Sequence, residues 1–308
     1  MKRWAGFAVL LALAGCTTTV SGTARPEPET PPANVALVDP VRTASVLTAV
    51  KAATEAVFSY DSTAAPAYEK AIADNLTPGA RDELAKLFAE VRKSTEPIRL
   101  VTRVIVSAAA EETPDKARVL TVLDQSSTRA GVTSKGIASV RLATVREGDR
   151  WRIGEIDVNP AGSPPVVERP GAGDRVFARV RDSARDGALR AAEALLQVDP
   201  ADPEGTYARY ESVSTGPLLT QFRQDKAARL NQIRSGSAKA SPVPNPAAAV
   251  MEVVDDKASV LLHATTDVTG VTGTAGQTTK KHLPIVLRLQ RLPEGWKAAG
   301  VESVQPLP

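Results

Sequence analysis

The chain has little cysteine and little histidine. Its single cysteine, Cys16, has no partner within the 308 residues, so no intramolecular disulfide is possible. The two histidines are His263 and His282, and a zinc site would need both of them plus a carboxylate. The first half has no histidine, so it cannot assemble a Ser/His/Asp triad. These shortages argue against hydrolases and metalloenzymes, and we expect no metal site and no cofactor.

Aromatic side chains, excess charge and long apolar runs are also scarce. Aromatic residues make up 4% of the chain, so small aliphatic side chains must fill the core. Lys and Arg number 38 against 35 Asp and Glu, and two of the cations, Lys2 and Arg3, lie at the extreme N-terminus. Nucleic-acid binding needs a concentrated basic face, so we expect no nucleic-acid partner. Beyond the first 15 residues no apolar run is long enough to cross a bilayer.

The N-terminus begins with Met1-Lys2-Arg3, continues through the apolar run Trp4–Leu13 and ends in Leu13-Ala14-Gly15-Cys16. A basic start, a short apolar run and small residues at a cut site are typical of a secretory signal. The last four residues resemble the lipobox of bacterial lipoproteins. That resemblance implies cleavage before Cys16, a diacylglycerol on its sulfur and acylation of the new N-terminus. The alternative is an ordinary signal peptide with a chance cysteine.

These features predict a protein held by lipid at the extracytoplasmic face of the cell membrane, after removal of a signal peptide at 1–15. Residues 16–43 are rich in proline and predict an extended tether. A second stretch rich in proline and glycine, 159–173, predicts a linker. The two stretches bracket two expected domains, 44–158 and 174–308.

The two expected domains look like copies of each other. Asp115-Lys116-Ala117 in the first corresponds to Asp256-Lys257-Ala258 in the second, and each is followed by an apolar strand, a hairpin and a tryptophan. Those tryptophans, Trp151 and Trp296, stand at nearly equal distances from the shared motif. One match could arise by chance, but the ordered series indicates a tandem duplication of whole domains.

Each copy has helical periodicity first and strand periodicity afterwards. Apolar residues recur at three- and four-residue steps in 46–58 and 176–196, and further helices are expected over 77–91 and 215–230. Alternating β-branched runs follow at 98–109, 117–127, 137–147 and 151–158, and at 250–254, 258–266, 283–292 and 296–304. The stretch 238–246, rich in Ser, Ala and Pro, is expected to be a mobile surface loop. The pattern predicts an α+β fold, in which N-terminal helices pack on one face of a curved antiparallel sheet.

This order of elements resembles the nuclear-transport-factor-2-like cone, also called the cystatin-like or ketosteroid-isomerase-like fold. The first copy resembles the actinobacterial Mce-associated (mammalian-cell-entry-associated) proteins more specifically. The residues that carry this resemblance are Ala56-Val57-Phe58-Ser59-Tyr60-Asp61, Leu123-Asp124-Gln125-Ser126-Ser127-Thr128-Arg129-Ala130-Gly131 and Arg150-Trp151-Arg152-Ile153. The second copy lacks the aromatic pair of the first motif, so its membership rests on internal symmetry.

Tyr60 and Asp61 are the candidates for chemistry. A ketosteroid-isomerase-like site needs an aspartate base and buried donors to an enolate oxygen, and both residues are expected near the mouth of the cone. The alternative is that Tyr60 fills the core and Asp61 terminates the helix by accepting hydrogen bonds from nearby backbone amides.

Asp124, Gln125 and Arg129 are candidates for partner recognition. With Gly131 close behind, they are expected at a hairpin tip, where they form either a recognition loop or a solvated turn. Trp151 begins the last strand of its domain and is either a core plug or a platform for a ligand.

The resemblance implies an accessory role beside Mce lipid importers. The expected function is a non-enzymatic docking or scaffold module, with proteins of the Mce complex as partners. One alternative is a carrier with a lipid or sterol inside one cone, and another is a ketosteroid-isomerase-like enzyme that uses Asp61. A large apolar cavity open to solvent would favour the carrier, whereas a closed core favours docking.

Overall fold

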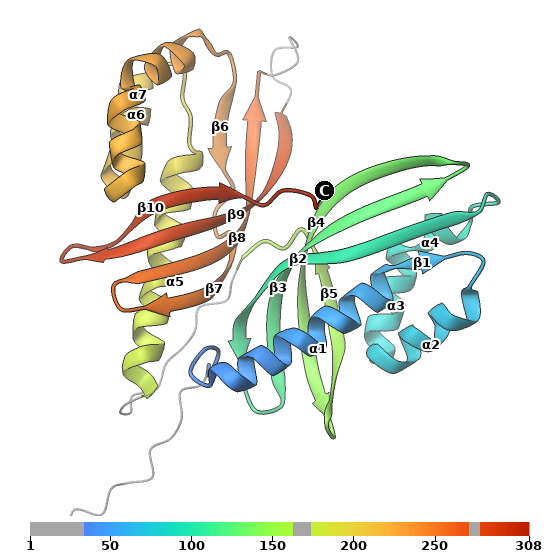
Figure 1. Cartoon of the computed structure of the whole chain (residues 1–308). Coiled ribbons are helices and arrows are strands. Elements are labelled where there is room, and N and C mark those ends of the chain that lie inside the picture. Colours follow the sequence, from blue (N-terminus) through green and yellow to red (C-terminus); the bar gives the residue numbers. More distant parts are fainter. Residues whose placement is uncertain (1–33, 163–173, 271–277, 308) are drawn as a thin grey trace, which may run out of the picture. The chain divides into compact units, whose positions relative to one another are not determined.

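The computed structural model describes residues 34–162, 174–270 and 278–307 and contains two antiparallel five-stranded sheets, each with its own helices (Figure 1). Cys16, most of the tether, most of the linker and residues 271–277 lie outside these residues. In each half the helices come first and the strands follow as a meander, which confirms the predicted α+β class with two tandem cones. Within the described ranges, no helix is long and apolar enough to span a membrane.

The first cone contains four helices and five strands. Its helices are α1 (Pro40–Phe58), α2 (Ala65–Asn75), α3 (Pro78–Leu87) and α4 (Ala89–Arg92). Its strands are β1 (Tyr60–Asp61), β2 (Ile98–Glu112), β3 (Lys116–Arg129), β4 (Val132–Glu147) and β5 (Arg150–Val158). The strands pair in chain order. The single helix expected over 77–91 is broken at Phe88, where α3 ends and α4 begins.

In the second cone, the described residues form three helices and five strands. Its helices are α5 (Asp174–Leu196), α6 (Pro203–Val213) and α7 (Gly216–Ser235). Its strands are β6 (Lys239–Pro242), β7 (Ala247–Val254), β8 (Lys257–Thr269), β9 (Thr278–Leu292) and β10 (Gly295–Ser303). The strand order is β10-β9-β8-β6. Strand β7 also pairs with β8, along 257–263, whereas β6 pairs with 266–269 of the same strand.

Local sequence fixes where the helices begin. The Asp39 carboxylate accepts a hydrogen bond from the backbone amide of Arg42 at 3.0 Å, and Pro40 occupies the first position of α1. Asp202 caps α6 in the same way by accepting from the amide of Gly205. An aspartate cap followed by proline satisfies a free amide and presets the helical φ angle.

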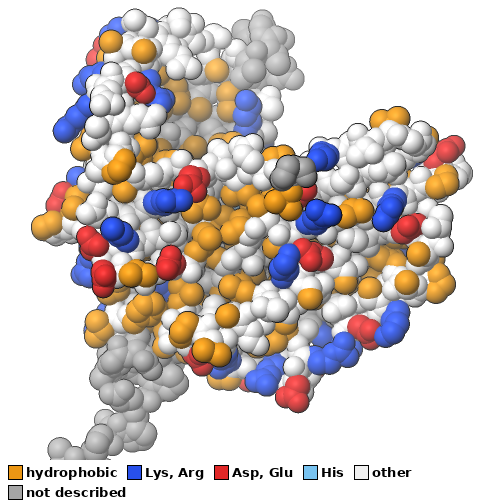
Figure 2. Space-filling view, viewed as in Figure 1, with side chains coloured by type: hydrophobic (Ala, Val, Ile, Leu, Met, Phe, Trp, Pro, Cys, Tyr) orange, Lys and Arg blue, Asp and Glu red, His pale blue; other side chains and the backbone are white. Residues whose placement is uncertain are grey.

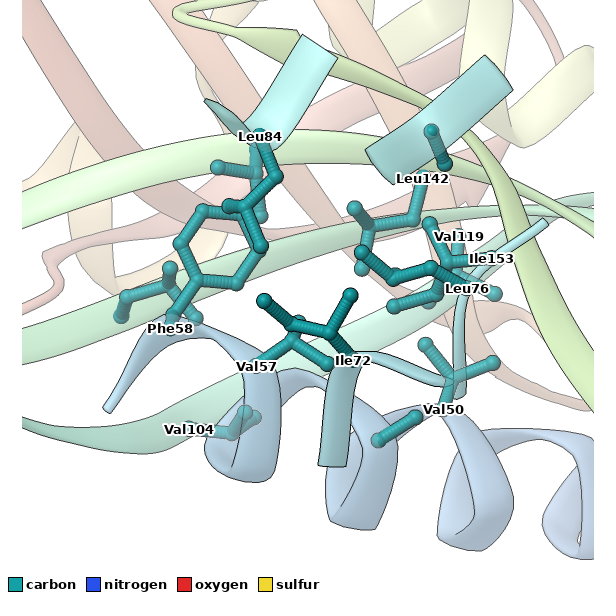
Figure 3. Packing of buried hydrophobic residues seen from close by; sticks show 14 of the residues in the cluster. Val50, Val57, Phe58, Ile72, Leu76, Leu84, Val104, Val119, Leu142 and Ile153 are labelled. Carbon is teal, nitrogen blue, oxygen red and sulfur yellow. The ribbon is translucent and has the colours of Figure 1, made fainter. Parts of the chain in front are cut away.

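The interior of the first cone is filled by side chains from α1–α3 and from the inner face of the sheet (Figure 3). Val57, Leu142 and Ile153 have no exposed surface, and the remaining members of the cluster are nearly as buried. Figure 3 shows labelled side chains from α1, from the other helices and from the sheet pointing toward one another. The second cone is filled largely by alanine on α5 and by Val260, Leu287 and Trp296 on its sheet.

The duplication extends to the attachment of the helices to the edge strands. The Thr77 amide, just before α3, donates to the carbonyl of Ile153, two residues after Trp151. The Thr215 amide, just before α7, donates to the carbonyl of Ala298, two residues after Trp296. The same bond at the same place in both cones supports the inference of a tandem repeat.

The stretch expected to be a mobile loop, 238–246, contains an edge strand instead. Residues 239–242 form β6, in which Lys239 pairs with Thr269 and Pro242 with Thr266. Together β6 and β7 occupy the place that the continuous strand β2 has in the first cone. The prolines Pro242, Pro244 and Pro246 lack the N–H that a continuous ladder needs, so the strand is divided here.

Each central strand is buried on both faces. A third apolar cluster joins Ala108, Leu120 and Val122 of the first sheet to Ala249 and Leu261 of the second. These residues alternate along their strands with those of the two cone interiors, so they lie on the faces turned away from the helices. Burial on both faces explains why the middle of each strand is largely apolar, over 119–123 in β3 and 260–264 in β8.

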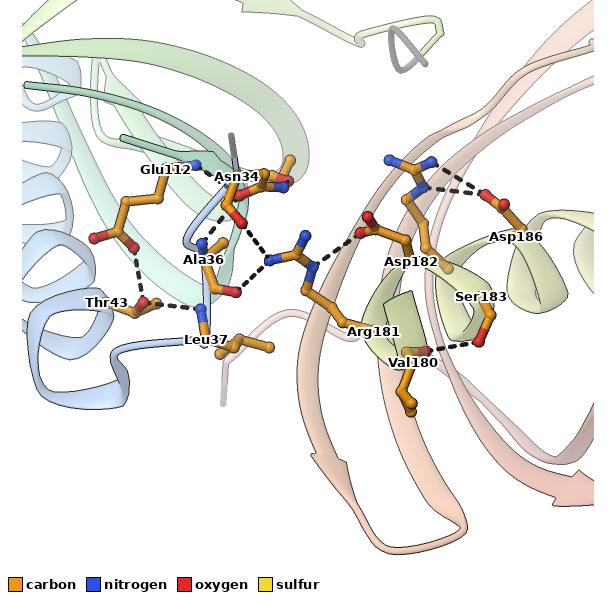
Figure 4. Close-up of polar contacts among 12 residues, drawn as sticks. Asn34, Ala36, Leu37, Thr43, Glu112, Val180, Arg181, Asp182, Ser183 and Asp186 are labelled. Atoms are coloured by element: carbon orange, nitrogen blue, oxygen red, sulfur yellow. Dashed lines mark hydrogen bonds and ion pairs between the residues drawn. The ribbon is translucent and has the colours of Figure 1, made fainter. Parts of the chain in front are cut away.

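A buried polar network adds to the contact between the two cones (Figure 4). Arg181 on α5 is 2% exposed and donates from one guanidinium nitrogen to the carbonyls of Asn34 at 3.0 Å and Ala36 at 2.6 Å. The Asn34 carboxamide oxygen accepts from the amide of Glu112. The Glu112 carboxylate accepts from the Thr43 hydroxyl at 2.7 Å. Burial raises the pKa of Glu112, whereas the Thr43 hydroxyl and the Arg42 guanidinium oppose that rise.

Gly187 on α5 gives a prediction about packing. A Cβ at this position would lie 2.5 Å from the Cβ of Trp296. Gly187→Ala is therefore expected to lower the free energy of unfolding, because overpacking costs about 1–3 kcal/mol and outweighs the roughly 1 kcal/mol that alanine gains in a helix. Chemical denaturation measures the change. Gly79→Ala is the matched control, because nothing lies within 4 Å of its added Cβ; equal effects at the two sites would contradict the prediction.

Candidate functional site

Tyr60 belongs to an aromatic cluster at one end of the first cone. It lies on β1 and is half-buried, and its ring meets Tyr68 edge-on at 5.0 Å and Phe88 at 6.3 Å. The Arg92 guanidinium stacks over Tyr68 at 5.4 Å. These contacts agree with the interpretation of Tyr60 as a packing residue.

Asp61 forms a local turn. Its carboxylate accepts from the amide of Thr63 at 2.9 Å and from the Thr63 hydroxyl at 2.6 Å. The hydroxyl and then the amide lower the pKa of Asp61. A general base that abstracts a carbon-bound proton works best when its pKa is near the working pH. The hydrogen bonds from Thr63 lower the pKa of Asp61 and so move it away from that range. The hydrogen bonds agree with a structural role in the chain reversal before α2.

Asp124, Gln125 and Arg129 do not form a hairpin tip. All three lie within β3, and the two-residue turn is Ala130-Gly131, whose φ angles of 47° and 78° suit a hairpin. Asp124 is 9% exposed and pairs in register with Ile137, and Gln125 donates from its side chain to the Thr102 hydroxyl at 3.3 Å. The expectation of a loop was wrong because these polar residues continue the strand up to the turn. Only Arg129, next to the turn, is exposed.

The six candidate residues do not converge on one site. Tyr60, Asp61 and Arg129 lie at the end of the sheet where β3 turns into β4. Tyr60 pairs with Leu100, and Asp61 pairs with Arg99. Arg129 pairs with the neighbouring Ile98. Trp151 pairs with Arg146 near the start of β3, at the opposite end. The full length of β3 separates the two groups.

A groove lies beside Trp151. It encloses about 510 Å³ and is bounded by the first turns of α1 and by the β4–β5 hairpin. We call it the Trp151 groove; its residues are Asp39, Val41, Arg42, Ser45, Val46, Ala49, Asn75, Arg146, Asp149, Arg150 and Trp151. Val41 is 80% exposed at its edge. An accessible indole beside guanidinium groups is suited to binding another molecule.

Two further surface hollows are less suited to a ligand. They enclose about 410 and 640 Å³ and lie over Lys116–Arg118 and beside the edge strand β5. Both are lined mainly by charged or hydroxyl side chains, with no aromatic ring. On the face drawn in Figure 2, basic and acidic side chains are interspersed, without one large basic area.

The two histidines come together where the sheets meet, which the sequence did not indicate. Their rings stack at 5.4 Å, and His263 is 1% exposed whereas His282 is exposed. Both ring nitrogens of His263 lack a hydrogen-bond partner within the described ranges. Burial, and secondarily the neighbouring His282, lowers the pKa of His263 to about 4. Among the residues that the structure describes, no group of three or more His, Cys, Asp or Glu side chains could hold a metal ion.

A second aromatic cluster also escaped the sequence analysis. Tyr207, Tyr210 and Phe222 pack together in the second cone, between α6 and α7. The periodicity of 215–230 pointed to the helix that carries Phe222, but the helix that carries the two tyrosines was not predicted. The cluster is largely buried and fills the space between the helices.

Comparisons with known proteins give structural neighbours at low identity. No protein-family model and no curated protein matches the chain. CagV of Helicobacter pylori, a VirB8 homologue of a type IV secretion system, has 9% identity and a TM-score of 0.33, and the match covers 41% of this chain and 99% of CagV. An IcmL-like type IV secretion protein of Legionella pneumophila has 12% identity and a TM-score of 0.32 over 45% of this chain and 97% of its own. An Ntf2-like protein involved in plasmid conjugation has 8% identity and a TM-score of 0.29 over 86% and 99%. These values assign no function to the chain.

Proposed function

We propose that this chain is a non-enzymatic docking module, held by lipid on Cys16 at the extracytoplasmic face of the membrane and accessory to a Mce-type lipid importer. The importer is suggested by the resemblance of the first cone to Mce-associated proteins, carried by 56–61, 123–131 and 150–153. The anchor is suggested by the resemblance of Leu13-Ala14-Gly15-Cys16 to a lipobox.

The single observation that favours docking over carrying is the filled interior of both cones. A lipid carrier needs an apolar cavity of some hundreds of cubic ångströms, and here buried side chains from the helices and the sheet occupy that place. The hollows beside Trp151, over Lys116–Arg118 and beside β5 lie at the surface, outside the two cone interiors, and charged side chains line each of them. Asp61, the candidate base, is held in a turn by Thr63, so a catalytic role has no support from its hydrogen bonds.

Co-purification from the native membrane tests the proposal. The full-length chain, solubilised in mild detergent, is expected to retain importer subunits and to carry no stoichiometric lipid besides the acyl groups on Cys16. Cys16→Ala is expected to leave the membrane fraction while keeping its affinity for the solubilised importer. Absence of importer subunits from the wild-type preparation would contradict the docking role, and a stoichiometric free lipid in the mass spectrum would favour the carrier.

A further inference from the structure

The repeat shows what the Trp151 groove lacks. In the second cone the seam between α5 and β10 is closed: Trp296 is 7% exposed, its indole N–H donates to the Ser183 hydroxyl at 3.0 Å, and Gly187 leaves room for its Cβ. The buried positions of α1 and α5 align, with Val46, Val50, Ala53 and Thr54 in register with Ala184, Ala188, Ala191 and Ala192. In this register Ser45 corresponds to Ser183, and Ala49 corresponds to Gly187.

The same seam is open in the first cone. Ala49 carries the Cβ that Gly187 lacks, and both Ala49 and Trp151 line the groove. Trp151 is half-buried, and its indole N–H has no partner within the described ranges. The groove of about 510 Å³ occupies the space that close packing removes in the second cone. One repeat therefore uses its tryptophan to close a seam. In the other, the half-buried Trp151 packs against the core of the cone and also lines the groove.

The charges of the groove favour an anionic occupant. Arg42 is held by Glu112 at 3.0 Å, and Arg146 lies 3.5 Å from Asp149. The guanidinium of Arg150, exposed at the hairpin, forms no side-chain hydrogen bond or ion pair with a described residue. Asp74 is ion-paired with Lys70 at 2.7 Å, which lowers the pKa of Asp74, and the charge of Arg150 adds to that effect. A guanidinium with free donors binds a carboxylate through two parallel hydrogen bonds.

We propose, building on the docking function above, that the Trp151 groove binds an acidic segment of a partner protein. A carboxylate of that segment pairs with Arg150, and an adjacent apolar side chain packs against Trp151 and Val41. A protein segment suits the groove better than a bilayer surface does. Asp39 and Asp149 also line the groove, and they would repel a continuous layer of anionic headgroups but leave room for a single carboxylate.

Peptide binding tests the inference with the full-length chain in detergent. The probe is a fluorescein-labelled peptide that carries one glutamate among leucine and serine residues, and the reference is the same peptide with lysine in place of the glutamate. Fluorescence anisotropy is expected to show binding of the acidic peptide alone, weakening as salt rises. Arg150→Glu and Trp151→Ala are each expected to weaken it at least tenfold. Lys257→Glu, the same charge reversal at an exposed position of the second cone, is expected to change it less than twofold.

Ala49→Gly tests the seam itself. Without the Cβ, Trp151 is expected to pack against α1 in the way that Trp296 packs against α5. Its fluorescence emission is then expected to shift to shorter wavelength, and the affinity for the peptide is expected to fall at least fivefold. Unfolding midpoints of all variants show whether the first cone remains folded. Unchanged affinity in Arg150→Glu or Trp151→Ala, or unchanged affinity in Ala49→Gly, would overturn the inference.

Two further results separate this inference from the proposed function. Vesicles containing 30% phosphatidylglycerol are expected not to compete with the peptide; competition that depends on Arg150 would assign the groove to lipid and overturn the inference. Wild type and Arg150→Glu could retain equal amounts of importer subunits. That result would show that the partner binds outside the Trp151 groove, which overturns the inference but leaves the docking function standing. If the chain binds the peptide but retains no importer subunit, the result would support the Trp151 groove as a binding site for an acidic segment. It would contradict the proposal that the importer is the partner.

Discussion

Replacing Arg181 with methionine is expected to lower the free energy of unfolding by about 3–5 kcal/mol, the loss typical of breaking a buried charged group's contacts. Arg181 is almost fully buried on α5, and one guanidinium nitrogen donates to the carbonyls of Asn34 and Ala36 (Figure 4). A second nitrogen donates to Asp182 at 2.9 Å. Methionine fills the same volume but leaves two buried carbonyls without a donor and Asp182 without its counter-charge.

Urea or guanidinium denaturation measures this change. Arg181→Lys is expected to recover only part of the loss, because an ammonium group cannot reproduce the fork that reaches the carbonyls and Asp182 together. Arg179→Ala is the matched control, since Arg179 lies on the same helix and is exposed. A loss below about 1 kcal/mol in Arg181→Met would mean that the contact between the N-terminal segment and α5 adds little to stability.

Acidification is expected to destabilise the protein through His263. The pKa of His263 is lowered to about 4 from an ordinary value of 6.5, so the folded protein keeps the imidazole neutral while the unfolded chain binds a proton below pH 6.5. Stability is therefore complete above pH 6.5 and falls as the pH decreases toward 4. At about 1.4 kcal/mol per pH unit the total loss is on the order of 3 kcal/mol, of which about 2 kcal/mol has occurred at pH 5.

The surroundings of His263 support the sign of this effect. His282 lies beside the ring and opposes its protonation, whereas Asp157 favours it, and burial exceeds both. Ala247 and Pro284 are its neighbours on the flanking strands and offer no charge. An imidazolium at the junction of the two sheets would thus be poorly stabilised.

His263→Val is the decisive variant, because Val122 holds the equivalent position in the first cone and packs between the sheets. Its free energy of unfolding is expected to change little between pH 7 and 5, where wild type loses about 2 kcal/mol. His282→Gln is the control and is expected to keep most of the wild-type dependence. Glu112 has a raised pKa and acts with the opposite sign, but it is present in every variant, so differences between variants isolate His263. Equal slopes in wild type and His263→Val would contradict the assignment.

The sequence predicted the local structure well where one interaction dominates. The three- and four-residue apolar spacing of 46–58 indicated α1, and Asp39 with Pro40 marks its start. The alternating runs indicated β2–β5 and β7–β10 because a half-buried strand needs that pattern. The strand β6 was missed because its proline and its polar residues are typical of loops. Only pairing with β8 makes it a strand.

The candidate site was harder to predict because it depends on how the elements pack. Sequence pattern alone placed Asp124 in a turn, but its neighbours across the sheet make it a buried strand residue. Trp151 and Trp296 look alike in sequence, but they differ in exposure, and the helix residues beside them, Ala49 and Gly187, lie about a hundred residues away along the chain. The meeting of His263 and His282 also requires the pairing of β8 with β9.

The amino-acid sequence by itself determined that helices precede the main strands in each copy, the division into two copies and the α+β class, because helix caps, apolar periodicity and hairpin turns act over a few residues. The tertiary structure alone decided that the sheets bury their outer faces against each other, that Arg181 and His263 become buried, and that one tryptophan seam closes while the other stays open. These outcomes depend on which surfaces lose water together and on a single Cβ at a helix–strand contact, and neither is encoded within any short stretch of the chain.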